Sequence, residues 1–263
     1  MNPDAKSIAI WSNSYKINAF EVDPTRKTTI QTLCKIMQEA AWDHAISFGL
    51  GYSQMLDRGL IWVLSRLKIR VFDFPRWGET IQIRTWPAGI HRLFALRDFQ
   101  VLDEASASIG EAASAWLILD EKSRRPARIE PLFHEMKIPT RESLFEFEEN
   151  LERLPSPHGY QTQPFFPVRV SDLDWHNHVN NVKYMEWISD SYTLEFHTHF
   201  QVAAFEIDFL SETHYGDEIT ICTQELEGSR PTFLHSLLRK RDGQEICIAR
   251  INWQKRKEEE KDE

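Results

Sequence analysis

The chain has 263 residues, of which 41% are hydrophobic, and it carries a formal net charge of −9. This composition supplies a core for one large domain or two modest ones, and the negative charge argues against general nucleic-acid binding. Its apolar runs are only a few residues long, so we expect no membrane insertion, and an acidic partner would need a local basic patch.

The compartment is predicted from the beginning of the chain and from its cysteines. The first residues, MNPDAKSIAIWSNSYK, show no basic-then-apolar signal pattern. Cys34, Cys222 and Cys247 are far apart and have no metal-binding spacing, which is typical of reduced, buried thiols. We therefore expect a cytoplasmic protein.

The first predicted element is a long helix over residues 30–48. Thr28 or Thr29 is its expected N-cap, and small side chains at positions 40, 41 and 45 would let it lie close against a sheet. Its apolar and small residues recur at the i, i+3, i+4, i+7 spacing of one helix face, namely Ile30, Leu33, Cys34, Met37, Ala40, Ala41, Ala45 and Phe48.

The segment after this helix recurs later in the chain. Residues 64–85 (LSRLKIRVFDFPRWGETIQIRT) align without a gap on residues 202–223 (VAAFEIDFLSETHYGDEITICT), so that Gly78 falls on Gly216 and Glu79 on Asp217. Both copies alternate apolar and polar residues around an aromatic-glycine-acid turn, which predicts a hairpin in each. Strand-like runs follow near residues 91–103 and 107–120, and again near 230–241 and 244–255.

This repeat predicts two halves with one architecture. Each half has a short leading strand, one long helix and about four antiparallel strands, an order satisfied by a strongly curved sheet wrapped around the helix. The expected class is α+β. We place the domains at residues 1–125 and 161–263, joined by a proline-containing linker over 126–160.

The richest cluster of polar groups precedes the second helix. Asp172–Asn181 reads DLDWHNHVNN and contains two carboxylates, two imidazoles and three amides. An amphipathic segment follows, so the cluster is a loop entering a helix that Asn180 or Asn181 caps. Such a junction offers free N–H groups and the positive end of the helix dipole, which suits it to hold a developing oxyanion.

The two halves differ in these polar groups. The first half has VDPTRKTT before its helix, and Phe74 stands at the register of Glu212. We therefore expect acid/base chemistry in the second half and an apolar pocket in the first.

The polar cluster also carries a family resemblance. DLDWHNHVNNVKYMEWISDS resembles the catalytic motif D-L-D-x-N-x-H-V-N-N-V-K-Y of the plant-type acyl-acyl carrier protein thioesterases and their bacterial relatives. LIWVLSRLKIRVFDFPRWGETIQIRTW resembles the strand pair after that family's first helix. The resemblance covers most of the chain. It implies a tandem (double) hotdog fold, in which each half is a long helix wrapped by an antiparallel sheet, and a site without metal or cofactor.

The same resemblance implies an activity and the residues that perform it. The activity is hydrolysis of a fatty acyl-acyl carrier protein thioester, which ends chain elongation in fatty acid synthesis. Asp174 matches the second motif aspartate, His178 the catalytic histidine and Glu212 the glutamate on the following strand. His176 stands where plant enzymes have a catalytic asparagine, and Thr213 stands where they have a cysteine.

Thioester hydrolysis needs a nucleophile, a proton acceptor and an oxyanion donor. We expect His178 and Glu212 to activate water, while Asp174 either orients the site or acts directly as base or nucleophile. Backbone N–H groups between His178 and Asn180, or the amide of Asn177, are the expected oxyanion donors. His176 could donate to the same oxygen or orient Asp174. The loop-supporting amides are Asn177, Asn180 and Asn181.

Alternative functions are an acyl-CoA thioesterase of the hotdog class and a non-catalytic acyl-binding hotdog. The chemical rival is a metal site, because His-x-His is a known ligand spacing and Asp172 and Asp174 lie nearby.

The expected partner is an acidic acyl carrier protein, which calls for basic residues at its docking site. Both a monomer and a homodimer are compatible with a double hotdog. The docking candidates are Arg124, Arg125 and Arg128, with Arg66, Lys68 and Arg70 on one face of a strand.

Overall fold

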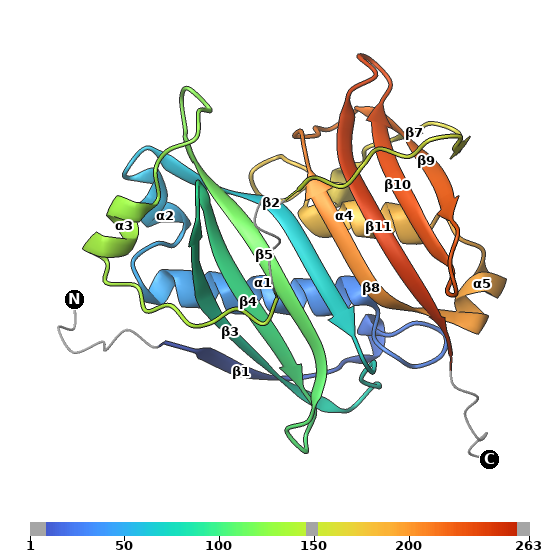
Figure 1. The fold of residues 1–263 in the computed structure, drawn as a ribbon, viewed down its shortest axis with the longest axis horizontal. Coiled ribbons are helices and arrows are strands. Elements are labelled where there is room, and N and C mark those ends of the chain that lie inside the picture. Colours follow the sequence, from blue (N-terminus) through green and yellow to red (C-terminus); the bar gives the residue numbers. More distant parts are fainter. Residues whose placement is uncertain (1–8, 146–151, 257–263) are drawn as a thin grey trace. The chain divides into compact units, whose positions relative to one another are not determined.

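The computed structural model describes residues 9–145 and 152–256. The chain divides into two compact units, which we call unit 1 (Met1–Glu152) and unit 2 (Arg153–Glu263). Each unit combines a helix with an antiparallel sheet (Figure 1), and the expected long helix is present in unit 1 (18 residues) but is shorter in unit 2 (9 residues).

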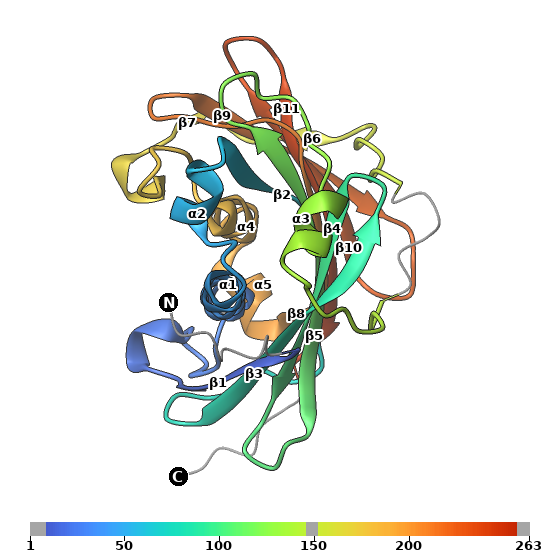
Figure 2. The same ribbon diagram turned by 90° about the vertical axis from the view of Figure 1, so that its left-hand side faces the viewer.

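Unit 1 is built around helix α1 (Ile30–Ser47), which begins where expected because the Thr29 side chain accepts a hydrogen bond from the Thr32 N–H. The helix packs against β1 and β3, and Figure 2 looks nearly along its axis. The sheet order is β1-β3-β4-β5-β2, and every pair is antiparallel. The strands are β1 (Trp11–Lys16), β2 (Leu60–Val71), β3 (Thr80–His91), β4 (Phe94–Leu102) and β5 (Ser108–Asp120), and the short helices are η1 (Ala19–Glu21), α2 (Tyr52–Leu56) and α3 (Glu130–Glu135).

Unit 2 repeats this plan around helix α4 (Asn181–Ser189), which buries Tyr184, Met185 and Ile188. The sheet order is β8-β11-β10-β9-β6, and β7 also pairs with β9. The strands are β6 (Gln161–Thr162), β7 (Phe166–Pro167), β8 (Phe200–Phe209), β9 (Glu218–Leu226), β10 (Thr232–Arg239) and β11 (Glu245–Lys255), and the short helices are η2 (Val170–Asp172) and α5 (Leu194–His199).

The predicted hairpins are wrong in both copies of the repeat. Strands β2 and β3 are consecutive in the chain, but β4 and β5 lie between them in the sheet, and β10 and β11 separate β8 from β9 in the same way. Alternation of apolar and polar residues indicates which face of a strand is buried. The same alternation would be seen whichever strand is the hydrogen-bonded partner, so it does not identify that partner. The later runs were predicted correctly, since β4 and β5 lie within 91–103 and 107–120, and β10 and β11 lie within 230–241 and 244–255.

The aromatic-glycine-acid turn has the same hydrogen bonds in both units. In unit 1 the Glu79 carboxylate accepts from the Arg76 N–H (2.9 Å), and the Glu79 N–H donates to the Arg76 carbonyl (3.1 Å). In unit 2 Asp217 and His214 make the equivalent bonds at 3.0 and 3.1 Å. The glycine before each acid has a φ of 91° or 81°, in the left-handed region that glycine enters without steric cost. This agreement in geometry supports the duplication.

Residues 141–145 lie along the sheet of unit 1 and are held by a buried carboxylate. Asp98 on β4 accepts hydrogen bonds from the Leu144 N–H and the Ser143 hydroxyl through Oδ2. Its Oδ1 is buried and has no hydrogen-bond partner among the residues that the structure describes. Burial raises the pKa of Asp98 to about 6.

We expect Asp98→Asn to stabilise the protein at neutral pH. The folded pKa of about 6 exceeds the unfolded value of about 4, so the stabilisation from protonating Asp98 is full below pH ~4 and is lost as the pH rises through ~6. Asparagine keeps an acceptor for Ser143 and Leu144 without a buried charge. The free energy of unfolding at pH 7.5 should rise by about 1–3 kcal/mol, with little change at pH 4.

Urea denaturation at the two pH values measures this difference. Asp120→Asn is the control of opposite sign, because a hydrogen bond from the Ser123 N–H lowers the pKa of Asp120 and its charge should stabilise the fold at neutral pH. An Asp98→Asn protein that is less stable than wild type at pH 7.5 would contradict the prediction.

Candidate active site

The loop between η2 and α4 is folded around the side chain of Asp174. Its Oδ1 accepts from the N–H groups of His176 (2.8 Å) and His178 (3.1 Å), and its own N–H donates to the His178 carbonyl (2.8 Å). Within the described part of the chain, Oδ2 accepts no hydrogen bond. Asp174 therefore shapes the loop with one carboxylate oxygen, and the other takes no part in holding the loop.

A backbone bond ties this loop to the segment that follows β8. The Val179 N–H donates to the Thr213 carbonyl (3.1 Å), which brings His178 next to Glu212. His178 Nε2 lies 3.9 Å from Glu212 Oε2, and both side chains are partly exposed, at 38% and 40%. This separation is too long for a direct hydrogen bond, but catalytic pairs often tighten when substrate binds. The two side chains lie close enough to act together as the acceptor of one proton.

The structure adds His214, which the sequence reasoning missed. Its ring centroid lies 5.3 Å from that of His178. His214 follows Glu212 by two residues, and side chains two apart in extended chain lie on one face. That spacing was the available signal, and it places a second imidazole beside the pair.

The asparagines have distinct structural positions. Asn180 caps α4, because its Oδ1 accepts from the Val182 N–H (2.9 Å), and Asn181 is the first residue of the helix. Asn177 has a φ of 64°, a left-handed conformation that asparagine tolerates better than most residues, and it is exposed. Asp172 is buried and accepts from the Arg169 N–H (2.8 Å), so it braces η2.

The backbone N–H groups expected as oxyanion donors are already engaged in this conformation. The N–H groups of residues 177, 178, 179 and 180 all donate within the protein, to Asp174, Asp172 or Thr213. A substrate carbonyl would have to compete with these bonds. The side chains of Asn177 and His176 therefore become the better donor candidates, and the His176 ring is packed against Trp175 at 3.6 Å between centroids.

Three further observations concern metal binding, membrane-spanning helices and disulfides. Over residues 9–145 and 152–256, no group of three or more histidine, cysteine, aspartate or glutamate side chains is arranged to hold a metal ion. None of the helices seen in these ranges combines the length and apolar character required to cross a membrane. Cys34, Cys222 and Cys247 are buried and form no disulfide.

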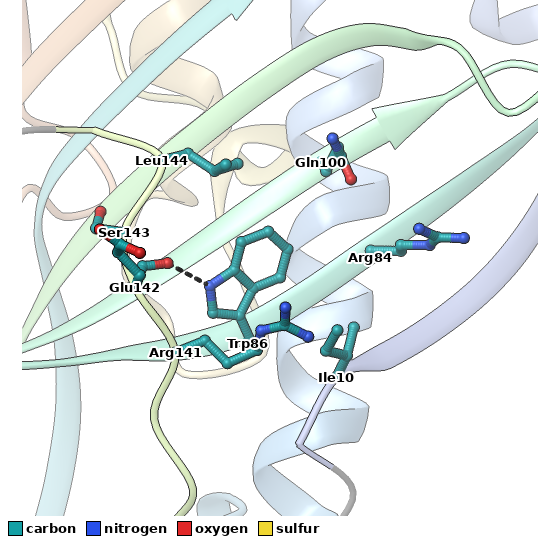
Figure 3. Close-up of a pocket in the computed structure, with 8 residues that line it drawn as sticks. All are labelled: Ile10, Arg84, Trp86, Gln100, Arg141, Glu142, Ser143 and Leu144. Atoms are coloured by element: carbon teal, nitrogen blue, oxygen red, sulfur yellow. Dashed lines mark hydrogen bonds between the residues drawn. The ribbon is translucent and has the colours of Figure 1, made fainter.

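Unit 1 contains a pocket of about 410 Å³ (Figure 3). The Arg141 guanidinium lies 5.8 Å from the Trp86 ring, whose N–H donates to the Glu142 carbonyl (3.3 Å). None of the candidate catalytic residues lines this pocket, and the apolar acyl pocket expected in the first half stays a prediction. The lining residues are Ile10, Arg84, Trp86, Gln100, Arg141, Glu142, Ser143 and Leu144.

The carrier-docking candidates also lie in unit 1. Arg124, Arg125 and Arg128 are exposed in the segment between β5 and α3. Arg66 donates to the Glu152 carbonyl (2.9 Å), and the Arg70 guanidinium lies 4.7 Å from the Phe145 ring. All three arginines of the first set are exposed, whereas in the second set Arg70 is exposed and Arg66 and Lys68 are half-buried.

Comparison with known proteins extends over nearly the whole chain. Residues 9–136 match the family model of the acyl-ACP thioesterase N-terminal domain, and residues 156–255 match that of the C-terminal domain. The chain is 29% identical over 253 residues to acyl-[acyl-carrier-protein] hydrolase FATB3, chloroplastic, of Cuphea viscosissima, covering 91% of this chain and 61% of that protein. It is 27% identical over 277 residues to oleoyl-acyl carrier protein thioesterase 1, chloroplastic, of Arabidopsis thaliana, covering 94% and 76%. The chain thus spans less than two thirds of the first relative.

Solved structures agree with these matches. The acyl-ACP thioesterase of Bacteroides thetaiotaomicron superposes with a TM-score of 0.84 at 25% identity, covering 94% of this chain and 98% of that one. The 12:0-ACP thioesterase of Umbellularia californica gives a TM-score of 0.83 at 22% identity, covering 95% of this chain and 98% of that one. The expected tandem hotdog fold is confirmed. On the two family matches, the chain belongs to the acyl-ACP thioesterase family.

Proposed function

We propose that this protein hydrolyses fatty acyl-acyl carrier protein thioesters to a free fatty acid and the carrier, which ends chain elongation. One observation carries the proposal: in a chain of this family, the loop built on Asp174 brings His178 within 3.9 Å of Glu212. A thioester hydrolase needs a carboxylate and a proton-transfer pair at one site, and this loop supplies both together with Glu212 from the segment after β8.

In the proposed reaction, water is the nucleophile. His178 and Glu212 together accept a proton from water as its oxygen adds to the thioester carbonyl carbon. The tetrahedral intermediate then collapses, the C–S bond breaks, and the same proton passes to the departing thiolate. The products are a carboxylic acid and the carrier thiol, so atoms and charge balance.

Asp174 has two roles within this scheme. Its Oδ1 holds the N–H groups of His176 and His178, which orients the loop. Its Oδ2 is the candidate for direct action, either as the base for water or as a nucleophile on the thioester carbonyl. The side-chain amide of Asn177, with His176 beside it, is the proposed donor to the developing oxyanion.

The proposed partner is an acidic acyl carrier protein that docks on Arg124, Arg125 and Arg128. With a net charge of −9, the chain needs such a local basic group to attract an acidic protein. We also propose a cytoplasmic location, because the three cysteines are buried thiols without disulfides.

The test compares kcat and KM for acyl-carrier and acyl-CoA substrates of several chain lengths at rising salt. We expect higher kcat/KM for the carrier-bound substrates. Salt between about 0.05 and 0.3 M should lower this kcat/KM several-fold with little change in kcat. Salt screens the attraction that brings the two proteins together and has less effect on the chemical step. Replacing all three arginines by glutamine should remove most of the salt effect for the carrier substrate and leave acyl-CoA hydrolysis unchanged.

Two results would favour the alternatives. A higher kcat/KM for acyl-CoA at every chain length would identify an acyl-CoA thioesterase. Tight binding of acyl-carrier without release of fatty acid would identify a non-catalytic acyl-binding protein.

A further inference from the structure

Arg239, the last residue of β10, connects the backbone of Glu212 to the turn between β10 and β11. Its side chain is buried, and Nη1 donates to the Glu212 carbonyl oxygen (3.0 Å). Nε donates to Asp242 (3.1 Å), while Nη2 donates to Asp242 (2.7 Å) and to Gln244 Oε1 (2.7 Å). These partners lie in the turn between β10 and β11, so the guanidinium has a fixed position.

The same guanidinium also lies next to the other end of the Glu212 segment. Arg239 Nη1 is 3.8 Å from Asp217 Oδ2, the oxygen that accepts from the His214 N–H. Asp217 is itself buried and pairs through Oδ1 with Arg241 (3.1 Å). Arg239 therefore contacts both ends of the segment 212–217, which carries Glu212 and His214.

Unit 1 shows that the segment folds without an arginine. Leu238 pairs with Thr220 and Leu102 pairs with Gln82, which are matched positions of the repeat, so the residue equivalent to Arg239 is Asp103. Asp103 instead accepts from the Ala107 N–H (2.8 Å) within its own turn. The aromatic-glycine-acid turn nevertheless has the same hydrogen bonds in both units. Forming the turn thus does not require Arg239.

The arginine instead occurs in the same unit as the glutamate. The unit with Glu212 has Arg239, and the unit with Phe74 at the matched position has Asp103. Phe74 is buried, whereas Glu212 extends beside His178 with 40% of its side chain exposed. A buried apolar ring is held by packing, but a carboxylate in a partly exposed site depends on its backbone being held in place.

We propose that Arg239 is a positioning residue that fixes Glu212 relative to His178 through the Glu212 carbonyl; this inference rests on the proposed thioester hydrolysis. Its physical basis is the steep dependence of rate on geometry, since a displacement of about 1 Å can lower catalysis about 100-fold. Arg239 touches neither substrate nor the reacting atoms.

The decisive experiment measures kcat and KM for Arg239→Lys in the wild-type and Glu212→Gln backgrounds. Lysine keeps a positive charge between Asp217 and Asp242 but lacks the planar fork that reaches the carbonyl and both acids at once. We expect kcat to fall about 10- to 100-fold with KM within about threefold. In the Glu212→Gln background, Arg239→Lys should cause no further fall in kcat, because there is no carboxylate left to position.

Arg239→Met is the second variant, and Arg250→Met is the matched control. Arg250 makes an ion pair with Glu206 on the same sheet without contacting segment 212–217, so its loss should leave kcat within about twofold of wild type. Circular dichroism and urea unfolding of each variant confirm that the measured protein is folded.

The outcomes separate this inference from the proposed function. If Glu212→Gln is slow but a folded Arg239→Lys keeps wild-type kcat, the positioning role is overturned and the proposed function stands. If Arg239→Lys lowers kcat equally in both backgrounds, its effect does not pass through Glu212, which also overturns the role. If Glu212→Gln itself keeps wild-type kcat, the catalytic assignment of Glu212 fails, and the inference fails with it.

Discussion

Replacing Asp174 with asparagine is expected to lower kcat at least 100-fold and to leave the fold intact. The reason is that Asp174 has separable structural and chemical roles. Asparagine can still accept the His176 and His178 N–H bonds through Oδ1, so the loop should keep its shape. It has no negative charge and cannot accept a proton or attack a carbonyl, and loss of such a group typically costs 10²–10⁴ in rate.

The measurement is steady-state hydrolysis of one acyl-carrier substrate, with unfolding by urea as the test of the fold. We expect KM to change little, because the shape of the loop is preserved. Asp174→Ala should lose the same activity and also destabilise the loop, since the two N–H groups then have no side-chain acceptor.

The control for Asp174→Asn is Asp172→Asn, two residues away. Asp172 is buried, accepts from the Arg169 N–H and lies 3.9 Å from Lys183 Nζ, so it braces the loop from behind. We expect this variant to keep most of its kcat. Asp174→Asn activity within threefold of wild type would exclude direct chemistry by this carboxylate and leave only its structural role.

The second large effect is expected from the His178 and Glu212 pair. His178→Gln and Glu212→Gln should each lower kcat about 100- to 1,000-fold, because either change removes half of the group that takes the proton from water. The double variant should be no slower than the slower single variant by more than about threefold. Residues that act as a unit show this strong departure from additivity.

The double-mutant cycle is measured with the same carrier-bound substrate. His214→Gln serves as the matched imidazole control, because its ring is 5.3 Å from His178 but it is not part of the assigned pair. We expect His214→Gln to lower kcat less than His178→Gln or Glu212→Gln does. Strict additivity of the His178 and Glu212 effects would show that the two side chains act independently, and the shared-base scheme would then be wrong.

How much of the site could be predicted depended on the distance between its parts in the sequence. The Asp174 loop, the Asn180 cap and the start of α4 lie within ten residues, and local propensity predicted their arrangement. Glu212 is more than thirty residues further on. It was found because the repeat supplied a matched position, Phe74, for comparison.

The same dependence on sequence separation explains the wrong strand pairing. The predicted hairpins required β2 to pair with β3. The chain between them, residues 72–79, instead leads to a position beyond β5 and β4 in the strand order of the unit 1 sheet. Strand alternation contains no information about the partner. The backbone oxyanion donors were expected because helix N-termini usually have free N–H groups, yet this loop satisfies its own groups with Asp172, Asp174 and Thr213.

By itself, the sequence determined the α+β class, the extent of α1, the start of α4, the duplication and the likeness of the Asp172–Asn181 loop to a thioesterase motif. These depend on residue spacing and on turn chemistry over a few positions, which are written locally in the chain. Only the tertiary structure decided strand order, the 3.9 Å approach of His178 to Glu212 and the contact of Arg239 with the Glu212 carbonyl. Those features join segments far apart in the chain. Long-range packing selects them, and local residue patterns contain no information about it.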